Sequence, residues 1–189
     1  MKIVFLDIDG VLNSERWYQY RYNNVDPHQW SAQYPFYEID PESVKWLNYV
    51  IDQTGAKIVV SSTWRLGRTV EELTRILQKC GVTGEIIDIT PRMHFTRETP
   101  ATVPRGCEID YWLNTKGFTR INWSKEKQKE YEEKAQVKNY VIFDDDSDMM
   151  YGQREHFVKC PGFTGLGEEQ AKKAVEILSQ SILTLYYKQ

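Results

Sequence analysis

The sequence predicts an α/β fold, a doubly wound parallel sheet with helices on both faces. Short runs that are apolar at nearly every position alternate with segments that have a helical spacing of apolar residues. Such strands are buried on both faces, and their alternation with helices is typical of a parallel sheet covered by helices. Polar and acidic residues follow three of the runs, and right-handed crossovers bring the carboxyl ends of parallel strands to one edge.

The expected strands and helices follow each other in regular order. Asp40 and Pro41 are typical of the start of a helix, and Gly55 is typical of its end. Thr69 and Glu72 have the spacing of a capping box at the start of the next helix. The expected strands are residues 3–8, 57–61, 85–89, 139–143 and 157–158. The expected helices are residues 41–54, 69–80, 107–113 and a last one with its apolar stripe at 171–182.

Two long segments and one charged run lie outside this alternation. Residues 13–38 are rich in Trp, Tyr and Arg, and we expect a loop that packs on its own side chains or closes over a site. Stacking of nucleic-acid bases on these rings is the alternative. Residues 90–106 form a second expected loop, and residues 125–138 an expected solvated helix. We expect a single domain over residues 1–189, with the aromatic insertion at about 13–38 and no large cap domain.

The bulk properties exclude several classes of protein. A net charge of -3 argues against a uniformly basic nucleic-acid surface, although it is compatible with a local basic groove. No apolar run approaches the ~20 residues that a membrane span needs, so no membrane association is expected. Cys80, Cys107 and Cys160 lack the spacing of metal ligands, and reduced thiols in the cytoplasm are the simplest interpretation. Nothing in the sequence calls for an obligate protein partner.

Asp7 and Asp9 follow the first expected strand, and Gly10 allows a turn directly after them. Two carboxylates in one cleft repel each other, and a bound Mg²⁺, which prefers oxygen ligands, relieves that repulsion. One carboxylate can attack phosphorus, and the other can move the proton of the leaving group. The pair therefore predicts Mg²⁺-dependent phosphoryl transfer.

Residues 5–12 (FLDIDGVL) resemble the first signature of the haloacid dehalogenase (HAD) superfamily. The resemblance implies a HAD-like, Rossmannoid fold and a HAD-type phosphatase, because the phosphatases of this superfamily have an Asp two residues after the nucleophile. It implies that Asp7 is the nucleophile and also a metal ligand through its carboxylate. It further implies that Asp9 is the general acid/base, with its backbone carbonyl on the metal.

The second and third signatures concern phosphate binding. Ser61 resembles the hydroxyl residue of the second signature, and Ser62 and Thr63 leave its register open by one or two positions. The third signature is normally a Lys at a helix start, and here the sequence departs from the pattern. Arg105 precedes an expected helix and can grip phosphate through two N–H groups, so it is the expected phosphate clamp. Lys116 is the alternative for that role.

The fourth signature, a strand that ends in acids, has its counterpart at residues 141–145. By this resemblance Asp145 is the preferred metal ligand and Asp144 the next, with Asp148 as an outer partner. Some acids of this cluster are instead expected to favour the start of a helix, where negative charge is stabilised.

Further elements resemble one HAD subgroup, that of the "Swiss army knife" RNA-repair proteins, and the phosphatase half of polynucleotide kinase-phosphatases. The elements are residues 61–65 (SSTWR), 105–109, 143–149 and 157–166. Within the first element, Arg65 is expected to bind phosphate or substrate, with pairing to a nearby acid as the alternative. Trp64 is interpreted as a packing residue.

These observations predict a Mg²⁺-dependent phosphomonoester hydrolase that forms an aspartyl-phosphate, with nucleic-acid ends or nucleotides as candidate substrates. The alternative from another class is a non-catalytic module that binds phosphate or nucleic acid on the same fold. A receiver-type switch is a third interpretation, but receivers accept phosphate at a middle strand, where this chain has Ser61 or Asp88. A P-loop kinase is disfavoured, because no glycine-rich segment ends in Gly-Lys-Ser/Thr.

Overall fold

The computed structural model describes residues 1–24, 38–94, 103–118, 130 and 133–181. Its strands are β1 (Lys2–Leu6), β2 (Lys57–Val60), β3 (Ile86–Ile89), β4 (Asn139–Asp144) and β5 (Phe157–Lys159). They form one parallel sheet in the order β3-β2-β1-β4-β5. The chain winds outward in both directions from the central strand β1, so the predicted doubly wound parallel sheet is confirmed.

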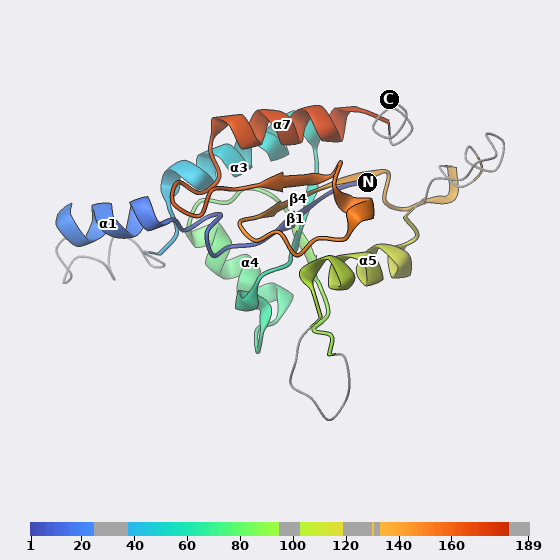
Figure 1. Ribbon diagram of the computed structural model, residues 1–189, viewed down its shortest axis with the longest axis horizontal. Helices are drawn as coiled ribbons and strands as arrows, with labels where there is room; N and C mark the ends of the chain where they lie inside the picture. The colour runs from blue at the N-terminus through green and yellow to red at the C-terminus, as the bar shows by residue number, and fades with distance from the viewer. Residues whose placement is uncertain (25–37, 95–102, 119–129, 131–132, 182–189) are drawn as a thin grey trace.

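Helices cover both faces of the sheet (Figure 1). They are α3 (Pro41–Thr54), α4 (Val70–Lys79), α5 (Arg105–Lys116) and α7 (Glu168–Ser179). On one face, α3, α4 and α7 share an apolar core with Val4 and Leu6 of β1. On the other face, α5 packs against Ile3 and Phe5. Successive residues of β1 thus point to opposite cores, which explains why the strand is apolar at every position from Ile3 to Leu6.

The predicted helix ends are confirmed where the sequence has capping residues. Asp40 Oδ1 accepts the N–H of Glu42 at 2.9 Å, and Gly55 ends α3 with φ 64°. At the start of α4, the hydroxyl of Thr69 accepts the N–H of Glu72 at 3.2 Å, and Glu72 accepts the N–H of Thr69 at 2.8 Å. These bonds satisfy N–H groups that lack partners within the helix. Local chemistry therefore decides where α3 and α4 begin.

The first part of the expected loop at 13–38 is a helix, α1 (Glu15–Asn24), which projects from the sheet in Figure 1. The hydroxyl of Ser14 accepts the N–H of Trp17 at 3.2 Å and caps this helix. The sequence did not reveal it because its aromatic residues form no apolar stripe. Residues 25–37 lie outside the described residues.

Other expected boundaries differ by a few residues. The helix α5 begins at Arg105, two residues earlier than expected, and α7 ends at Ser179. Residues 95–102 of the second expected loop and residues 125–129, 131 and 132 of the charged run are not among the described residues. In the described part of the chain, no helix is both long and apolar enough to cross a membrane.

Candidate functional site

The candidate site lies where β1, β2 and β4 end at the same edge of the sheet. Parallel pairing continues one residue beyond β1 and β2. The N–H of Asp7 bonds to the carbonyl of Phe143 at 3.0 Å, and the N–H of Ser61 bonds to that of Leu6 at 2.8 Å. The acids after β1 and β4 and the hydroxyls after β2 therefore meet, as the sequence predicts.

Three carboxylates form an acidic triad: Asp7, Asp144 and Asp145 each offer an oxygen within 4.8 Å of the others. Asp7 and Asp144 are buried, and Asp145 is half-buried. Burial, reinforced by the charge of Asp7, raises the pKa of Asp144 to about 7. Burial likewise raises the pKa of Asp7 and of Asp145. The triad consists only of oxygen donors whose negative charges disfavour one another, and a hard divalent cation fits such a set.

Two glycines give Asp145 its place in the acidic triad. Gly10 has φ 71°, and a Cβ there would collide with the Asp145 carboxylate. A Cβ on Gly162, which follows β5, would lie 2.9 Å from Asp145 Oδ2. Both contacts would be closer than real Cβ atoms approach other atoms, so the carboxylate fits only because neither position carries a side chain.

Asp9 is close in sequence to this triad, but its carboxylate is held by other residues. Its Oδ1 accepts the side-chain amide N–H of Asn13 at 2.8 Å and the indole N–H of Trp64 at 3.0 Å. Its Oδ2 accepts the hydroxyl of Thr63 at 3.1 Å. The sequence interpretation of Trp64 as a packing residue is therefore incomplete, because the indole packs against the core and also donates to Asp9.

The two serines after β2 have different partners. The hydroxyl of Ser62 bonds to the side chain of Asp7 and thereby counteracts the rise in its pKa. The hydroxyl of Ser61 faces Thr90, whose hydroxyl lies 3.3 Å away. Both serines are buried. The register left open in the sequence thus resolves geometrically: Ser62 is the serine whose side chain touches Asp7.

Arg65 is buried, and its guanidinium is occupied by acceptors inside the protein. It donates to the carbonyl of Thr90 at 2.9 Å, to the carbonyl of Ser62 at 2.6 Å and to Glu108 at 2.5 Å. Both side chains of the Arg65–Glu108 pair are about 95% buried, with exposures of 4% and 5%. The structure therefore shows the alternative of acid pairing for Arg65, in place of a free phosphate ligand.

Arg105 begins α5 and lies next to the acidic triad. Its guanidinium is 3.9 Å from Asp144 and 3.7 Å from Glu108. Its backbone N–H bonds to Asp148 Oδ2 at 2.6 Å, so Asp148 caps α5 and is not part of the triad. Lys116 is at the opposite end of α5, roughly 16 Å along the helix, where it pairs with Asp88 at 3.2 Å. The structure thus places Arg105, and not Lys116, beside the acidic triad.

A cavity of about 300 Å³ opens beside Arg105. It lies between the turn after β2, the start of α5 and the segment that follows β3. Its lining residues are Thr63, Arg65, Leu66, Arg92, Val103, Arg105, Glu108 and Asp148. Arg65 is paired with Glu108, and Arg92 and Arg105 add further positive charge to this lining.

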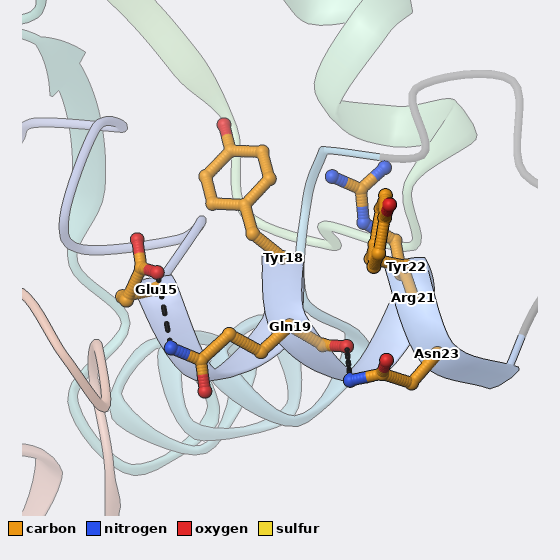
Figure 2. A pocket seen from close by; sticks show the side chains of 6 residues that line it. All are labelled: Glu15, Tyr18, Gln19, Arg21, Tyr22 and Asn23. Carbon is orange, nitrogen blue, oxygen red and sulfur yellow. Dashed lines mark hydrogen bonds between the residues drawn. The ribbon is translucent and has the colours of Figure 1, made fainter.

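A second cavity, of about 390 Å³, lies along α1 (Figure 2). Glu15, Gln19 and Asn23 follow one another along the helix, joined by hydrogen bonds, and Tyr18, Arg21 and Tyr22 complete the lining. The Arg21 guanidinium lies 4.9 Å from the centre of the Tyr18 ring. Trp17 and Tyr20 stack with ring centres 5.6 Å apart. Three of the four aromatic residues of α1 thus contact neighbours on the helix, whereas Tyr22 is 84% exposed.

Residues 3–171 match the family model of the HAD domain in Swiss Army Knife RNA repair proteins. The chain belongs to this family of HAD domains. No curated protein and no solved structure matched the chain. Membership of a HAD family together with the acidic triad indicates a phosphatase-type hydrolase, and the resemblance that the sequence motifs suggested is confirmed.

Proposed function

We propose that the protein is a Mg²⁺-dependent phosphomonoester hydrolase in which Asp7 is the nucleophile and Asp9 the general acid/base. The observation that carries this proposal is the acidic triad at the carboxyl edge of the sheet, with Asp7 buried beside the hydroxyl of Ser62. Family membership supports it, because a HAD domain of RNA-repair proteins indicates phosphatase chemistry.

The carboxylates of Asp7, Asp144 and Asp145 would hold the Mg²⁺, together with the backbone carbonyl of Asp9. Their all-oxygen donor set and the raised pKa values of the three carboxyls support that choice. When bound, Mg²⁺ neutralises negative charge on the phosphate and on the nucleophile.

The protein residues have these roles in the reaction. A carboxylate oxygen of Asp7 attacks phosphorus as the ester P–O bond breaks, and Asp9 gives its proton to the departing oxygen. Asp9 then takes a proton from the water that attacks the aspartyl-phosphate, which restores the Asp7 carboxylate and releases phosphate. Ser62 and Arg105 donate hydrogen bonds to the phosphoryl oxygens, where negative charge must be held in position.

We further propose that the substrate is a nucleotide or a phosphorylated nucleic-acid end. The family description, RNA repair, supports this class of substrate. The cavity beside Arg105 supports it too, since its volume of about 300 Å³ exceeds what a phosphoryl group alone needs and Arg92 adds positive charge. No large cap domain covers the edge of the sheet in the described part of the chain, which leaves room for a large substrate.

The test is phosphate release from a panel of substrates with and without Mg²⁺. The panel contains an aryl phosphate, nucleoside 5′- and 3′-monophosphates, and oligonucleotides that carry a 5′- or a 3′-phosphate. Mg²⁺-dependent release from the nucleotides or oligonucleotides is the expected result. No release from any member, with binding of the oligonucleotides retained, would favour the non-catalytic binding module.

The pKa of Asp144 predicts how Mg²⁺ changes stability with pH. Without metal, the pKa of Asp144 in the folded protein is about 7, against an ordinary value of 3.8. Above about pH 4 the unfolded chain therefore loses a proton that the folded protein keeps. Stability then falls as pH rises through this window, by roughly 4 kcal/mol in total at about 1.4 kcal/mol per pH unit. Mg²⁺ relieves this penalty, so we expect it to raise Tm more at about pH 8 than at about pH 5.

The measurement compares wild type with Asp144→Asn in EDTA and in Mg²⁺. This comparison is needed because His156 has the opposite effect: burial lowers its pKa to about 4, and its contribution to stability is lost as pH falls. Asp144→Asn is expected to be more stable than wild type in EDTA at about pH 8 and to respond little to Mg²⁺. An unchanged difference between the two proteins from about pH 4 to about pH 8 would contradict the prediction.

Gly162→Ala is expected to weaken Mg²⁺ binding by about 10-fold, because the new methyl group pushes Asp145 out of place. The readout is the Mg²⁺ concentration that gives half of the rise in Tm. Gly152→Ala is the matched control, since a Cβ there meets nothing within 4 Å. Equal Mg²⁺ affinity in both variants would show that the Asp145 carboxylate does not bind the ion from its observed position.

A further inference from the structure

We propose that Trp64 is a positioning residue that aims the Asp9 carboxylate at the leaving group through its indole N–H. The inference rests on the proposed function, in which Asp9 transfers the proton. The turn after β2 contributes Thr63 and Trp64, which both donate hydrogen bonds to the Asp9 carboxylate. We infer that this turn sets the direction in which the carboxylate points.

The two carboxylate oxygens of Asp9 have different kinds of hydrogen-bond partner. Oδ1 accepts N–H groups from Asn13 at 2.8 Å and from Trp64 at 3.0 Å, and neither group can accept a proton. Oδ2 meets the hydroxyl of Thr63 at 3.1 Å, and a hydroxyl can both donate and accept. The proton can therefore arrive at and leave Oδ2 without breaking any of the three bonds.

Trp64 can hold the Asp9 carboxylate in one orientation because its own ring and backbone are held in place. Its ring packs against the hydrophobic core, and its backbone N–H bonds to the hydroxyl of Ser62 at 3.3 Å. The next residue, Arg65, is locked by its buried bond to Glu108. The indole is neutral, so it orients Asp9 without placing a second positive charge near the site. Such a charge would compete with Arg105 for the phosphate of the substrate.

Asp9 needs such a partner because its side chain is exposed and belongs to the turn that contains Gly10, near three other carboxylates. Left alone, it would adopt several rotamers, and only those within hydrogen-bond reach of the leaving oxygen transfer a proton. A displacement of about 1 Å can cost up to about 100-fold in rate. Loss of the indole N–H is therefore expected to slow the step that needs a proton.

The experiment compares Trp64→Phe with wild type on an alkyl phosphate and on dinitrophenyl phosphate in Mg²⁺. An alkoxide leaves only with a proton, whereas dinitrophenolate leaves without one. We expect kcat/KM to fall by about 10-fold or more on the alkyl ester and by less than about 3-fold on the dinitrophenyl ester. The matched control is Trp46→Phe, which removes an indole bond to Glu42 of 2.9 Å on the outer face of α3. That variant should match wild type on both esters.

The outcomes separate this inference from the proposed function. An equal fall on both esters, with an active wild type, overturns the positioning role of Trp64 and leaves the phosphatase standing. A wild type that releases phosphate from neither ester nor any member of the substrate panel overturns the phosphatase, and the positioning role with it.

A second measurement does not depend on turnover. The indole N–H resonance that Trp64→Phe removes is expected to shift in Asp9→Ala, while that of Trp46 stays in place. An unshifted Trp64 resonance would show that the bond to Asp9 is absent in solution, which overturns the inference directly.

Discussion

Asp7→Asn is expected to lower phosphomonoester hydrolysis by at least about 10⁴-fold, the scale of loss when a covalent nucleophile is removed. An amide nitrogen or oxygen does not form the acyl-phosphate, so the first step of the proposed reaction has no nucleophile. Phosphate release with Mg²⁺ present, from the best substrate of the panel, is the measurement.

The variant should fold normally, because the Asn oxygen can still accept the N–H of Ile8, which lies 2.7 Å from Asp7 Oδ1. It also removes one charge from the acidic triad, where the charge of Asp7 raises the pKa of Asp144. The thermal stability of Asp7→Asn without metal should therefore equal or exceed that of wild type. Asp52→Asn, an exposed change on α3, is the matched control and should retain full activity. Mg²⁺-dependent turnover in Asp7→Asn would refute the assignment of the nucleophile.

The sequence predicted the sheet and the meeting of its strand ends because both follow from local patterns. A strand such as β1, which is apolar at every position from Ile3 to Leu6, must be buried on both faces. Parallel strands connected by right-handed crossovers end at one edge of the sheet. Asp7 and Asp144 directly follow or end such strands, so their proximity needed no knowledge of tertiary contacts. The acidic triad was predictable for that reason.

The side-chain partners within the site were not predictable, since they join residues far apart in the chain. Arg65 and Glu108 are separated by 43 positions and Asp9 and Trp64 by 55. Whether a buried Arg binds an acid or a ligand depends on what the fold places beside it. In the same way, the choice between Ser61 and Ser62 depends on how the chain turns after β2, which the run of hydroxyl residues leaves open.

The second large effect concerns the buried pair of Arg65 and Glu108. Glu108→Gln is expected to lower the free energy of unfolding by about 3–5 kcal/mol, because it leaves the Arg65 cation buried without its counter-charge. Arg105, 3.7 Å from the same carboxylate, loses one of its two acidic partners and keeps Asp144. Urea unfolding is the measurement. Glu42→Gln, which removes an exposed ion pair with Lys45, is the matched control and should cost less than about 1 kcal/mol.

Removing the charges of both Arg65 and Glu108 separates their effect on protein stability from their effect on the position of the turn after β2. Arg65→Met with Glu108→Leu buries no unpaired charge, so it should recover most of the stability that Glu108→Gln loses. It should not recover activity, because Arg65 also holds the carbonyl of Ser62 at 2.6 Å and thereby the turn that carries Ser62 and Trp64. Full activity in this double variant would mean that the turn keeps its shape without Arg65. A double variant as unstable as Glu108→Gln would instead mean that packing, and not the unpaired charge, sets the cost.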